Sequence, residues 1–536
     1  MPPPATPPAE VKVEAPAEVK PATPEVPVVA AFVPPTRPPG PAGAVYFAIA
    51  DRGVVRLVDG KFTLLGNSPT QLVKGLQVGG DGAVWVVGFQ DLLRLDGDKF
   101  RKISEAGYSE IGGTIDHFAV TAGGEVWAAT FKGVSHYANR AWTTEEKAKI
   151  GAGEDLLAGI AVDKAGRVWV ASTHKLHLRD NGAWRDVDVS QAGPSSMLFF
   201  ESLALAPDDS VYALASTALL HTSAAGVVTR VPLGGRSIAS YGRLSVASGG
   251  GLAARDGDSA IVWPAGGSVR VYESRDGKDF AADNIQAVAA DDRGRVWVAS
   301  ELGVAILGPG DTKTEWPSGT VPELVGEATA ILVVGAGPEK LPAAGPLRKG
   351  GLTGKVLSNG SPQTGVPVEL CPSPDMMFTD SPCADSAVKF VTTTDDKGVW
   401  TVTEVPLATY GIAVKLGEKW QITLGERLGQ GMQEGKVYDT GSLALERNPA
   451  GAMLMGPPTF AALFGATLGR KRFGRGLGTL HLIFGAIGLL LCTIILGDER
   501  VASGMVQAGL GTYLSVGSGV AAVIAGLIGL ISPDKK

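Results

Sequence analysis

Histidine is the residue through which this chain would most readily do acid–base or metal chemistry, and six occur, at positions 117, 136, 174, 177, 221 and 481. His174 and His177 are the close pair. Their spacing of three across a turn could present both rings to one surface, as part of a metal site or an acid–base pair. Because no third ligand is apparent, we prefer the simpler interpretation of a polar turn residue and a strand residue. The chain also lacks P-loop, HExxH, GxSxG and CxxC motifs, so we expect no catalytic residue, no metal and no cofactor.

Carboxylates and cysteines offer two further kinds of chemistry. Cys371 and Cys383 lie twelve residues apart in a loop rich in Pro, Ser and Asp, and we predict a disulfide between them, with two unrelated thiols as the alternative. Such a bond requires an oxidising compartment. Aspartates that could bind Ca²⁺ recur in glycine-containing turns, but Asp also stabilises tight turns by accepting backbone hydrogen bonds, which is the interpretation we prefer. They are Asp81, Asp163, Asp208, Asp209, Asp291 and Asp292.

A repeat of about 42 residues must position these side chains. Its unit is a glycine turn, a Val-Trp-Val or Val-Trp-Ala strand, a short turn and a second apolar strand. Seven copies begin at Val45, Val84, Val126, Val168, Val211, Leu252 and Val296. Four short strands per unit at this period are typical of a β-propeller. In the third unit we predict strands A to D over 115–120, 125–129, 134–137 and around Trp142, with the Trp column packed between blades.

The first unit lacks a strand A before Val45, whereas 328–334 follows the last unit as a strand A without a strand B. We predict that 328–334 completes the first blade from the other end of the chain, with 28–32 as the alternative. A ring closed in this way leaves no free edge.

The turns between strands B and C lie at one end of a propeller, here called the top face, and they supply the candidate ligand-binding residues. These are Gln90, Asp91, Lys132, His174, Lys175, Asp256, Asp258 and Glu301. The set is mixed in charge and contains no convergent His/Glu cluster, which indicates a binding surface more than an active site.

Outside the propeller, expected over 44–337, composition divides the chain further. Residues 1–43 hold 14 prolines and predict a spacer without a core, and 338–349 is a linker. Residues 350–447 alternate short strands and turns, as a small β-sandwich does. Residues 448–536 predict a membrane region with helices near 477–496 and 508–532, because about 20 apolar residues cross the ~30 Å hydrocarbon core; 453–468 is a candidate third span. The predicted fold class is therefore all-β, with C-terminal transmembrane helices.

Orientation in the membrane follows from charge and cysteines. Arg470, Lys471, Arg472 and Arg475 place their segment and the C-terminus in the cytoplasm by the positive-inside rule. Two spans would then leave the propeller in the cytoplasm, and three would place it outside. The predicted disulfide favours the outside, whereas no signal peptide is recognisable at Met1. We reconcile the two by expecting a leader upstream of Met1, with propeller and sandwich in the cell envelope.

Units such as 292–304, DRGRVWVASELGV, resemble two-component-regulator-type propeller repeats, and the resemblance extends over about 44–337. Such repeats form extracytoplasmic sensor regions of some hybrid histidine kinases and also occur in streptogramin-lyase-like propellers. Units 5 and 6 depart from the pattern because they lack the Trp. Residues 350–445 resemble carboxypeptidase-regulatory-like or Cna-B-type modules through GKV at 354–356, GVPV at 365–368 and TDDKG at 394–398. No kinase, receiver or helix-turn-helix segment follows.

These observations predict a membrane-anchored, non-enzymatic binding or scaffold protein that presents its propeller face to a protein, peptide or glycan. A net charge of −6 argues against nucleic acid as a partner. One alternative is a ligand-sensing receptor that signals through its membrane helices to a separate partner. The other is a propeller enzyme of the streptogramin-lyase kind.

Overall fold

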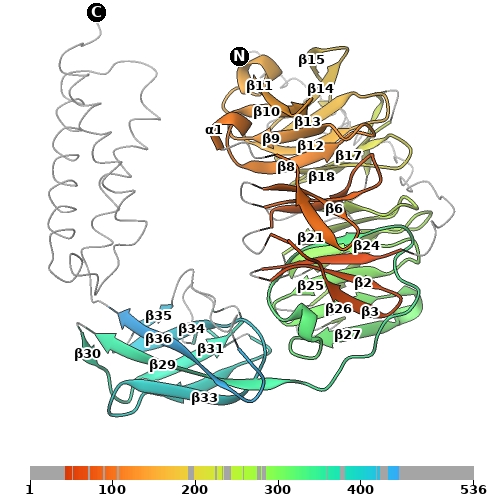
Figure 1. Ribbon diagram of the computed structural model, residues 1–536. Coiled ribbons are helices and arrows are strands. Elements are labelled where there is room, and N and C mark those ends of the chain that lie inside the picture. Colours follow the sequence, from red (N-terminus) through yellow and green to blue (C-terminus); the bar gives the residue numbers. More distant parts are fainter. Residues whose placement is uncertain are drawn as a thin grey trace, which may run out of the picture.

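The computed structural model describes residues 43–445, except 51, 70–72, 89–90, 105–107, 191–197, 224–225, 232, 234–242, 258, 275–278, 281–284, 359, 373, 375–380, 385, 418 and 423–431. Within this part the chain is almost entirely β-structure (Figure 1). It forms nine four-stranded sheets, seven from the repeats and two from the segment that follows. The predicted all-β class is confirmed.

Each repeat forms one antiparallel sheet, or blade, and adjacent strands are joined by tight turns. Blades 1 to 3 contain β28 (Ala328–Val333), β1 (Val45–Ile49), β2 (Gly53–Val58) and β3 (Lys61–Leu64); β4 (Gly75–Val78), β5 (Val84–Val87), β6 (Leu92–Asp96) and β7 (Lys99–Lys102); and β8 (Ile115–Val120), β9 (Val126–Thr130), β10 (Gly133–Ala138) and β11 (Ala141–Glu146). Blades 4 and 5 contain β12 (Leu157–Val162), β13 (Val168–Ser172), β14 (Leu176–Asp180) and β15 (Ala183–Asp186); and β16 (Phe200–Leu205), β17 (Val211–Ala215), β18 (Ala218–Thr222) and β19 (Val228–Val231).

Blades 6 and 7 complete the set with β20 (Leu244–Val246), β21 (Leu252–Asp256), β22 (Ser259–Trp263) and β23 (Arg270–Glu273), and with β24 (Ile285–Ala290), β25 (Val296–Ser300), β26 (Gly303–Leu307) and β27 (Lys313–Pro317). The helices are single turns at α1 (Tyr108–Ile111), α2 (Lys147–Ile150), η4 (Pro309–Asp311) and η5 (Pro322–Leu324).

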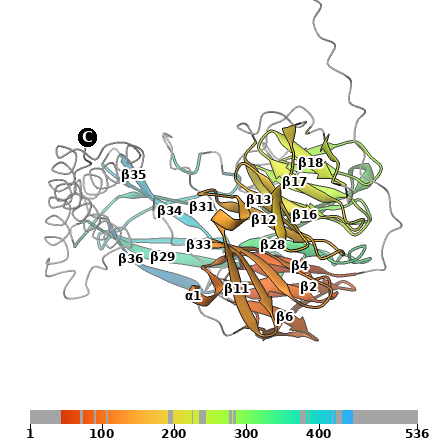
Figure 2. The same ribbon diagram turned by 90° about the horizontal axis from the view of Figure 1, so that it is seen from above.

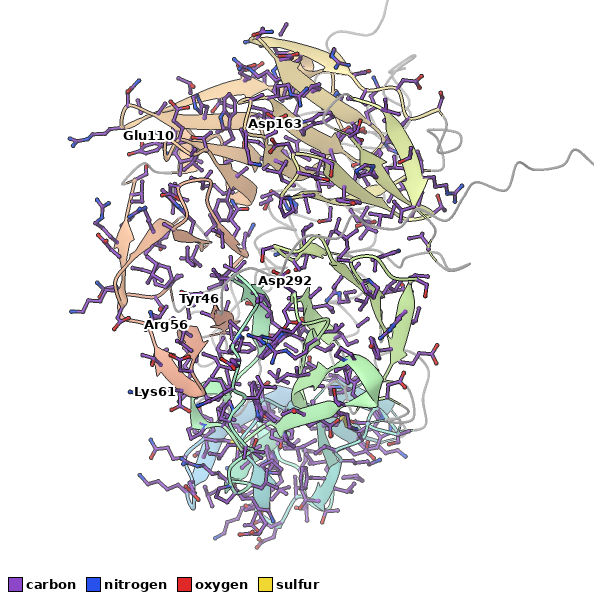
Figure 3. All side chains as sticks on the ribbon, turned by 90° about the vertical axis from the view of Figure 1, so that its right-hand side faces the viewer. Tyr46, Arg56, Lys61, Glu110, Asp163 and Asp292 are labelled. Atoms are coloured by element: carbon purple, nitrogen blue, oxygen red, sulfur yellow. A yellow bond between two sulfur atoms is a disulfide. The ribbon has the colours of Figure 1, made fainter. Side chains whose placement is uncertain are left out.

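The blades form a closed propeller. Every inner strand, the A strand of its blade, contacts the A strands of both neighbours, from β28 through β4, β8, β12, β16, β20 and β24 back to β28. Figure 3 looks along the axis of this ring, and Tyr46, Arg56 and Lys61 on β1, β2 and β3 lie progressively farther from its centre. Strands A to D therefore run from the axis to the rim in each blade.

The ring closes as predicted from the sequence. β28 pairs with β1, with Val45 opposite Val333 and Ala48 opposite Ala330. The inner strand of blade 1 thus comes from the far end of the repeat region. The alternative segment for this position, 28–32, lies outside the described residues. Closure removes the free edge that an open sheet array would expose.

The core consists of apolar layers between neighbouring blades. Trp169 and Leu178 of blade 4 are fully buried in one cluster with Leu203 and Ala213 of blade 5. Trp297 of blade 7 packs in the same way with Phe47 of blade 1, their ring centres 6.1 Å apart. The alternation of strand B places these large side chains on one face of each blade, so the Trp column packs between blades as predicted.

Two further four-stranded sheets follow, and their side chains share one core. One contains β30 (Ser361–Pro362), β29 (Lys349–Ser358), β33 (Val399–Pro406) and β36 (Val437–Leu445), and the other β32 (Phe390–Thr393), β31 (Pro367–Cys371), β34 (Gly411–Leu416) and β35 (Lys419–Ile422). This sandwich lies beside the propeller, at the lower left in Figure 1 and at the left in Figure 2. A hydrogen bond connects the two parts: the Ser318 hydroxyl donates to the Leu407 carbonyl at 3.0 Å.

The sandwich contains the predicted disulfide between Cys371 and Cys383, both fully buried. Glu369 secures the loop that it closes, because its carboxylate accepts bonds from the Ser381 hydroxyl (2.8 Å) and the Cys383 backbone N–H (3.2 Å). Burial opposes ionisation of Glu369, but hydrogen bonds from Lys389 and Ser381 outweigh it and hold the pKa of that carboxyl below its ordinary value.

No helix within the described part of 43–445 is long and apolar enough to cross a membrane. The predicted spans at 453–468, 477–496 and 508–532 lie outside the described residues, as does the spacer 1–42.

Candidate functional site

The six predicted ligand-binding residues that the structure describes lie at the top face, distributed over blades 2, 3, 4, 6 and 7. Gln90 and Asp258 lie outside the described residues. Asp91 is 3.2 Å from the Lys102 ammonium, Lys132 is exposed, Asp256 ends β21, and Glu301 is buried with 6% of its surface exposed. His174 and Lys175 belong to one polar network in blade 4, which is the part of the set that the fold brings together.

The blade 4 network extends over Asp155, Ser172, His174, His177 and Asp186. His177 Nδ1 lies 2.9 Å from Asp186 Oδ1, and its Nε2 lies 3.1 Å from the Ser172 hydroxyl. Asp155 contacts the same hydroxyl at 3.2 Å and the His174 ring at 3.0 Å. The two histidines therefore do not face one surface as a metal pair, because each bonds its own carboxylate.

Protonation in this network follows from burial. Burial lowers the pKa of His177 despite the opposing charge of Asp186, so the ring is neutral near pH 7. Burial alone would raise the pKa of Asp186, but hydrogen bonds from Lys175 and His177 lower it below its ordinary value. The Asp186 carboxylate can only accept, so His177 donates through Nδ1, and the single hydroxyl hydrogen of Ser172 lies between two acceptors, His177 Nε2 and the Asp155 carboxylate.

The order of these groups is that of a Ser–His–Asp triad, but the triad is not accessible to a substrate. Ser172 and His177 have no exposed surface, so a substrate in solution cannot reach the hydroxyl. The network instead fixes the loop before β12 and holds His174 at the surface, where its side chain is 43% exposed. We assign it a positioning role.

Three large apolar side chains emerge at the top face of blades 3, 4 and 5, and we call them the apolar arc. Phe131 follows β9, Leu156 precedes β12 and Phe199 precedes β16, with exposed fractions of 66%, 64% and 45%. The His174 ring lies edge-on to Phe199 with centres 5.2 Å apart. Adjacent exposed apolar side chains on a rigid scaffold mark an interaction site more often than single scattered ones do.

Backbone hydrogen bonds hold the arc in place. The Leu156 carbonyl accepts from the Thr173 N–H at 2.9 Å, and the Phe199 carbonyl accepts from the Ser216 N–H, also at 2.9 Å. The Lys147 ammonium lies 5.0 Å from the centre of the Phe131 ring. Neither Lys147 nor Lys132 has a carboxylate partner in the described part of the chain, whereas Lys175 pairs with Asp186 and Lys149 with Glu145. The edge of the arc near Phe131 is therefore cationic.

A second group of residues gathers where the inner strands begin, and the sequence analysis missed it. Five inner strands skip one residue in their pairing with strand B at the same place, which is a β-bulge: Asp116, Ala158, Glu201, Gln286 and Thr329. Bulges re-aim side chains and are frequent next to functional sites. Four of the five residues are polar, so a polar second residue in an otherwise apolar strand A was the available signal.

Charged side chains lie close to the bulge residues of the inner strands. The Lys74 ammonium lies 2.6 Å from Asp116, and the Arg243 guanidinium donates to the Lys74 carbonyl. Burial, aided by the positive charge of Arg243, lowers the pKa of neighbouring His117 to about 4, so its ring is neutral near pH 7. The inner ends of blades 2, 3 and 6 therefore form one polar cluster around the axis.

At the opposite end of the blades, the turn aspartates have structural partners. Asp291 accepts from the Arg295 guanidinium at 2.7 Å, the Trp297 indole N–H at 2.9 Å and the Arg295 backbone N–H at 2.9 Å. Asp163 makes the corresponding bonds in blade 4. The preferred interpretation of these aspartates as turn residues is supported. No group of three or more His, Cys, Asp or Glu able to hold a metal occurs among the residues described.

No family model matches the chain, and no curated protein matches it. Among solved structures, streptogramin B lyase is 11% identical with a TM-score of 0.38, over 51% of this chain and 87% of that one. The extracellular domain of the one-component system BT4673 from B. thetaiotaomicron is 12% identical with a TM-score of 0.39, over 74% of this chain and 62% of that one. YCF48 from Cyanidioschyzon merolae is 13% identical with a TM-score of 0.34, over 47% and 85%.

Similarities this low carry no argument about function. The assignment of a seven-bladed propeller rests on the strand pairing and the contacts between inner strands described above.

Proposed function

We propose that this protein is a membrane-anchored binding protein whose apolar arc docks a peptide segment of a protein partner. The observation that carries the proposal is the exposure of Phe131, Leu156 and Phe199 at the top face of neighbouring blades. Buried, these three side chains would each contribute about 1.5–3 kcal/mol, a large part of a micromolar affinity.

Charge defines the partner further. Lys132 and Lys147 flank Phe131 without carboxylate partners in the described residues, so a segment combining apolar and acidic side chains complements the surface. Catalysis is not proposed, because the Ser172 hydroxyl is inaccessible. The proposal also includes three predictions made from the sequence: the membrane anchor, the extracytoplasmic position, and the division into spacer, propeller, sandwich and anchor.

The test is selection of a displayed library of random dodecapeptides on the full-length protein in detergent, followed by affinity measurement of the enriched peptides. We expect peptides rich in apolar and acidic residues that bind at least about tenfold more weakly to Phe131→Ser/Leu156→Ser/Phe199→Ser. Val227→Ser is the matched control, because Val227 is 60% exposed at the turn between β18 and β19, away from the arc. Failure to enrich peptides, or equal binding to the triple variant, would overturn the proposal.

A further inference from the structure

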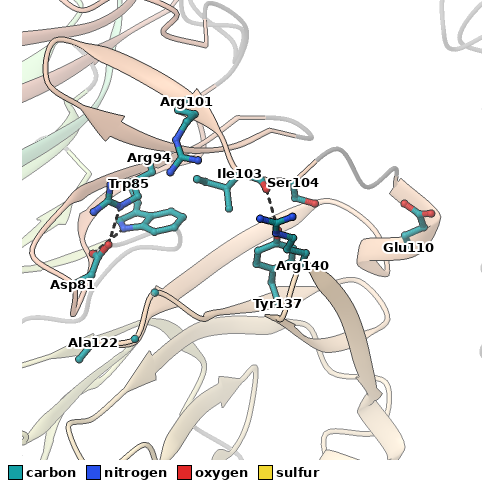
Figure 4. Close-up of a pocket in the computed structure, with 12 residues that line it drawn as sticks. Asp81, Trp85, Arg94, Arg101, Ile103, Ser104, Glu110, Ala122, Tyr137 and Arg140 are labelled. Carbon is teal, nitrogen blue, oxygen red and sulfur yellow. Dashed lines mark hydrogen bonds and ion pairs between the residues drawn. The ribbon is translucent and has the colours of Figure 1, made fainter.

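A groove with a volume of about 980 Å³ lies between blades 2 and 3, apart from the apolar arc (Figure 4). Trp85, Arg94 and Arg101 line it from blade 2, and Tyr137 and Arg140 from blade 3. This volume falls in the range of small-molecule and oligosaccharide sites. This groove is not predictable from the repeat pattern because its two walls come from different repeats.

On the face toward blade 3, blade 2 carries a charged residue where blade 4 carries an apolar one. Trp85, Arg94 and Arg101 are paired across β5, β6 and β7 and form one row on the face toward blade 3. In blade 4 the corresponding row is Trp169, Leu178 and Arg185, and Leu178 is fully buried against blade 5. Polar residues also occupy this place in other blades, as Arg56 in blade 1, His136 in blade 3 and His221 in blade 5, so Arg94 contributes a charge to the groove but does not alone account for its size.

The gap between blades 6 and 7 gives a second comparison. The row there has Val262 in place of Arg94, and the cavity between these blades measures about 110 Å³. The groove between blades 2 and 3 is thus about nine times the volume of the cavity between blades 6 and 7.

The three guanidinium groups of the groove have different partners. Arg94 is neutralised by Asp81, with Nε 2.9 Å from the carboxylate, and Asp81 also accepts from the Trp85 indole N–H at 3.0 Å. Arg101 has a 3.7 Å contact with Asp96, and both of these side chains are more than 60% exposed. Arg140 has no hydrogen bond or ion pair within the described part of the chain, and it adopts a left-handed backbone conformation with φ of 65°.

Arg101 and Arg140 therefore stand on opposite walls, and Figure 4 shows both side chains directed into the groove. Asp81 and Glu110 also line the groove, so three arginines face two carboxylates and the lining keeps an excess of positive charge. A guanidinium binds a carboxylate through two parallel hydrogen bonds. A ligand that engages both must carry anionic groups at intervals along its length. The backbone turn at 122–124, with two glycines, lets such a ligand approach without meeting a side chain.

We propose that this groove binds an acidic oligosaccharide, with one uronate carboxylate on Arg101 and another on Arg140. A nucleic acid is disfavoured, because the Trp85 ring is 2% exposed and offers no platform for base stacking. A single phosphate would satisfy one guanidinium and leave the other wall unused. This site is independent of the proposed peptide surface, so either can fail without the other.

The experiment measures binding of trigalacturonic acid to the full-length protein in detergent by isothermal titration calorimetry. We expect Arg101→Gln and Arg140→Gln each to weaken binding by about tenfold or more, because each loses a charge-assisted bidentate pair. Arg185→Gln is the matched control, since it occupies the position of Arg101 in the closed blade 4–5 interface. Its affinity should equal that of the unmodified protein.

Two further arms separate the ligand classes. Maltotriose, a neutral trisaccharide, should not bind, and inorganic phosphate should not displace trigalacturonic acid at equal concentration. The proposal is overturned by absence of trigalacturonic acid binding, by equal binding to Arg101→Gln and Arg140→Gln, or by equal affinity for maltotriose or phosphate. Because Arg101, Arg140 and Arg185 are exposed, their variants should keep the thermal midpoint of the parent, and measuring that midpoint for each variant verifies it.

Discussion

Replacing Asp291 by alanine should destabilise the propeller far more than breaking an ion pair of equal length at its surface. Asp291 has no exposed side-chain surface, and its removal leaves the Arg295 guanidinium, 12% exposed, without its carboxylate. It also leaves the indole N–H of Trp297, which is fully buried, without an acceptor. Asp98 offers the contrast, because it lies the same 2.7 Å from Arg56 but is 67% exposed.

The magnitudes follow from burial. Breaking a buried pair by removing one partner costs about 3–5 kcal/mol, and the stranded indole N–H is part of that loss. An exposed pair contributes about 0–1 kcal/mol. At about 2 °C per kcal/mol for a large domain, Asp291→Ala should lower the thermal midpoint by about 6–10 °C, and Asp98→Ala by at most about 2 °C.

The assay is thermal unfolding followed by tryptophan fluorescence, on the unmodified protein, Asp291→Ala and Asp98→Ala under one set of conditions. Asp291→Asn is informative as a third variant, because the amide can still accept from the indole but carries no charge for Arg295. Its midpoint should lie between those of the parent and Asp291→Ala. Equal midpoints for Asp291→Ala and Asp98→Ala would refute the reasoning that burial makes this carboxylate essential.

Three other predictions concern the closure, the disulfide and acid stability. Ile331→Pro, in the inner strand of blade 1, should open the ring and increase the rate of limited proteolysis at least severalfold, and an unchanged digestion pattern would contradict closure by β28. Serine at both Cys371 and Cys383 should cost about 3 kcal/mol in the chain-entropy model, seen as a lower unfolding midpoint of the sandwich that reducing agent no longer affects. His117 has a folded-state pKa of about 4 and regains about 6.5 on unfolding, so the unfolded state binds the extra proton and stability falls as pH drops from about 6.5 to 4. His117→Asn should therefore lose less stability than the parent between pH 7 and 5 in urea titrations, and an identical loss would show that His117 does not titrate in this window.

The propeller was predictable because its signal repeats. Alternation in each Val-Trp-Val strand, the glycine turns and the spacing of the copies determine four-stranded blades, and the orphan strand after the last copy indicated how the ring closes. The sixth blade, with Ala253 where the other blades have Trp or Tyr, was found by spacing alone. Packing of the aromatic column followed from the period of two.

The site was less predictable, because it depends on contacts between repeats. The groove between blades 2 and 3 is lined by residues of two repeats, and no pattern within one repeat predicts that they face each other. Likewise, Phe131 and Leu156 are apolar residues at strand ends, which sequence periodicity assigns to the core as readily as to the surface. The close histidine pair could be recognised in the sequence. That each histidine bonds a different carboxylate, Asp155 or Asp186, could be seen only in the structure.

The strand exchange in blade 1 also determines how the propeller would respond to mechanical force. Because Val45 and Val333 are paired at the same end of β1 and β28, tension applied across these two points would separate the strands one hydrogen-bonded pair at a time, as a zipper opens. The chain beyond β28 is, however, fastened to blade 7: Arg295 donates to the Pro338 carbonyl at 2.7 Å, and the Trp316 indole donates to the Pro342 carbonyl at 2.9 Å. A force applied through the sandwich therefore acts on blade 7 before it reaches the β1–β28 pairing, so the strand pair that closes the ring is protected from that force.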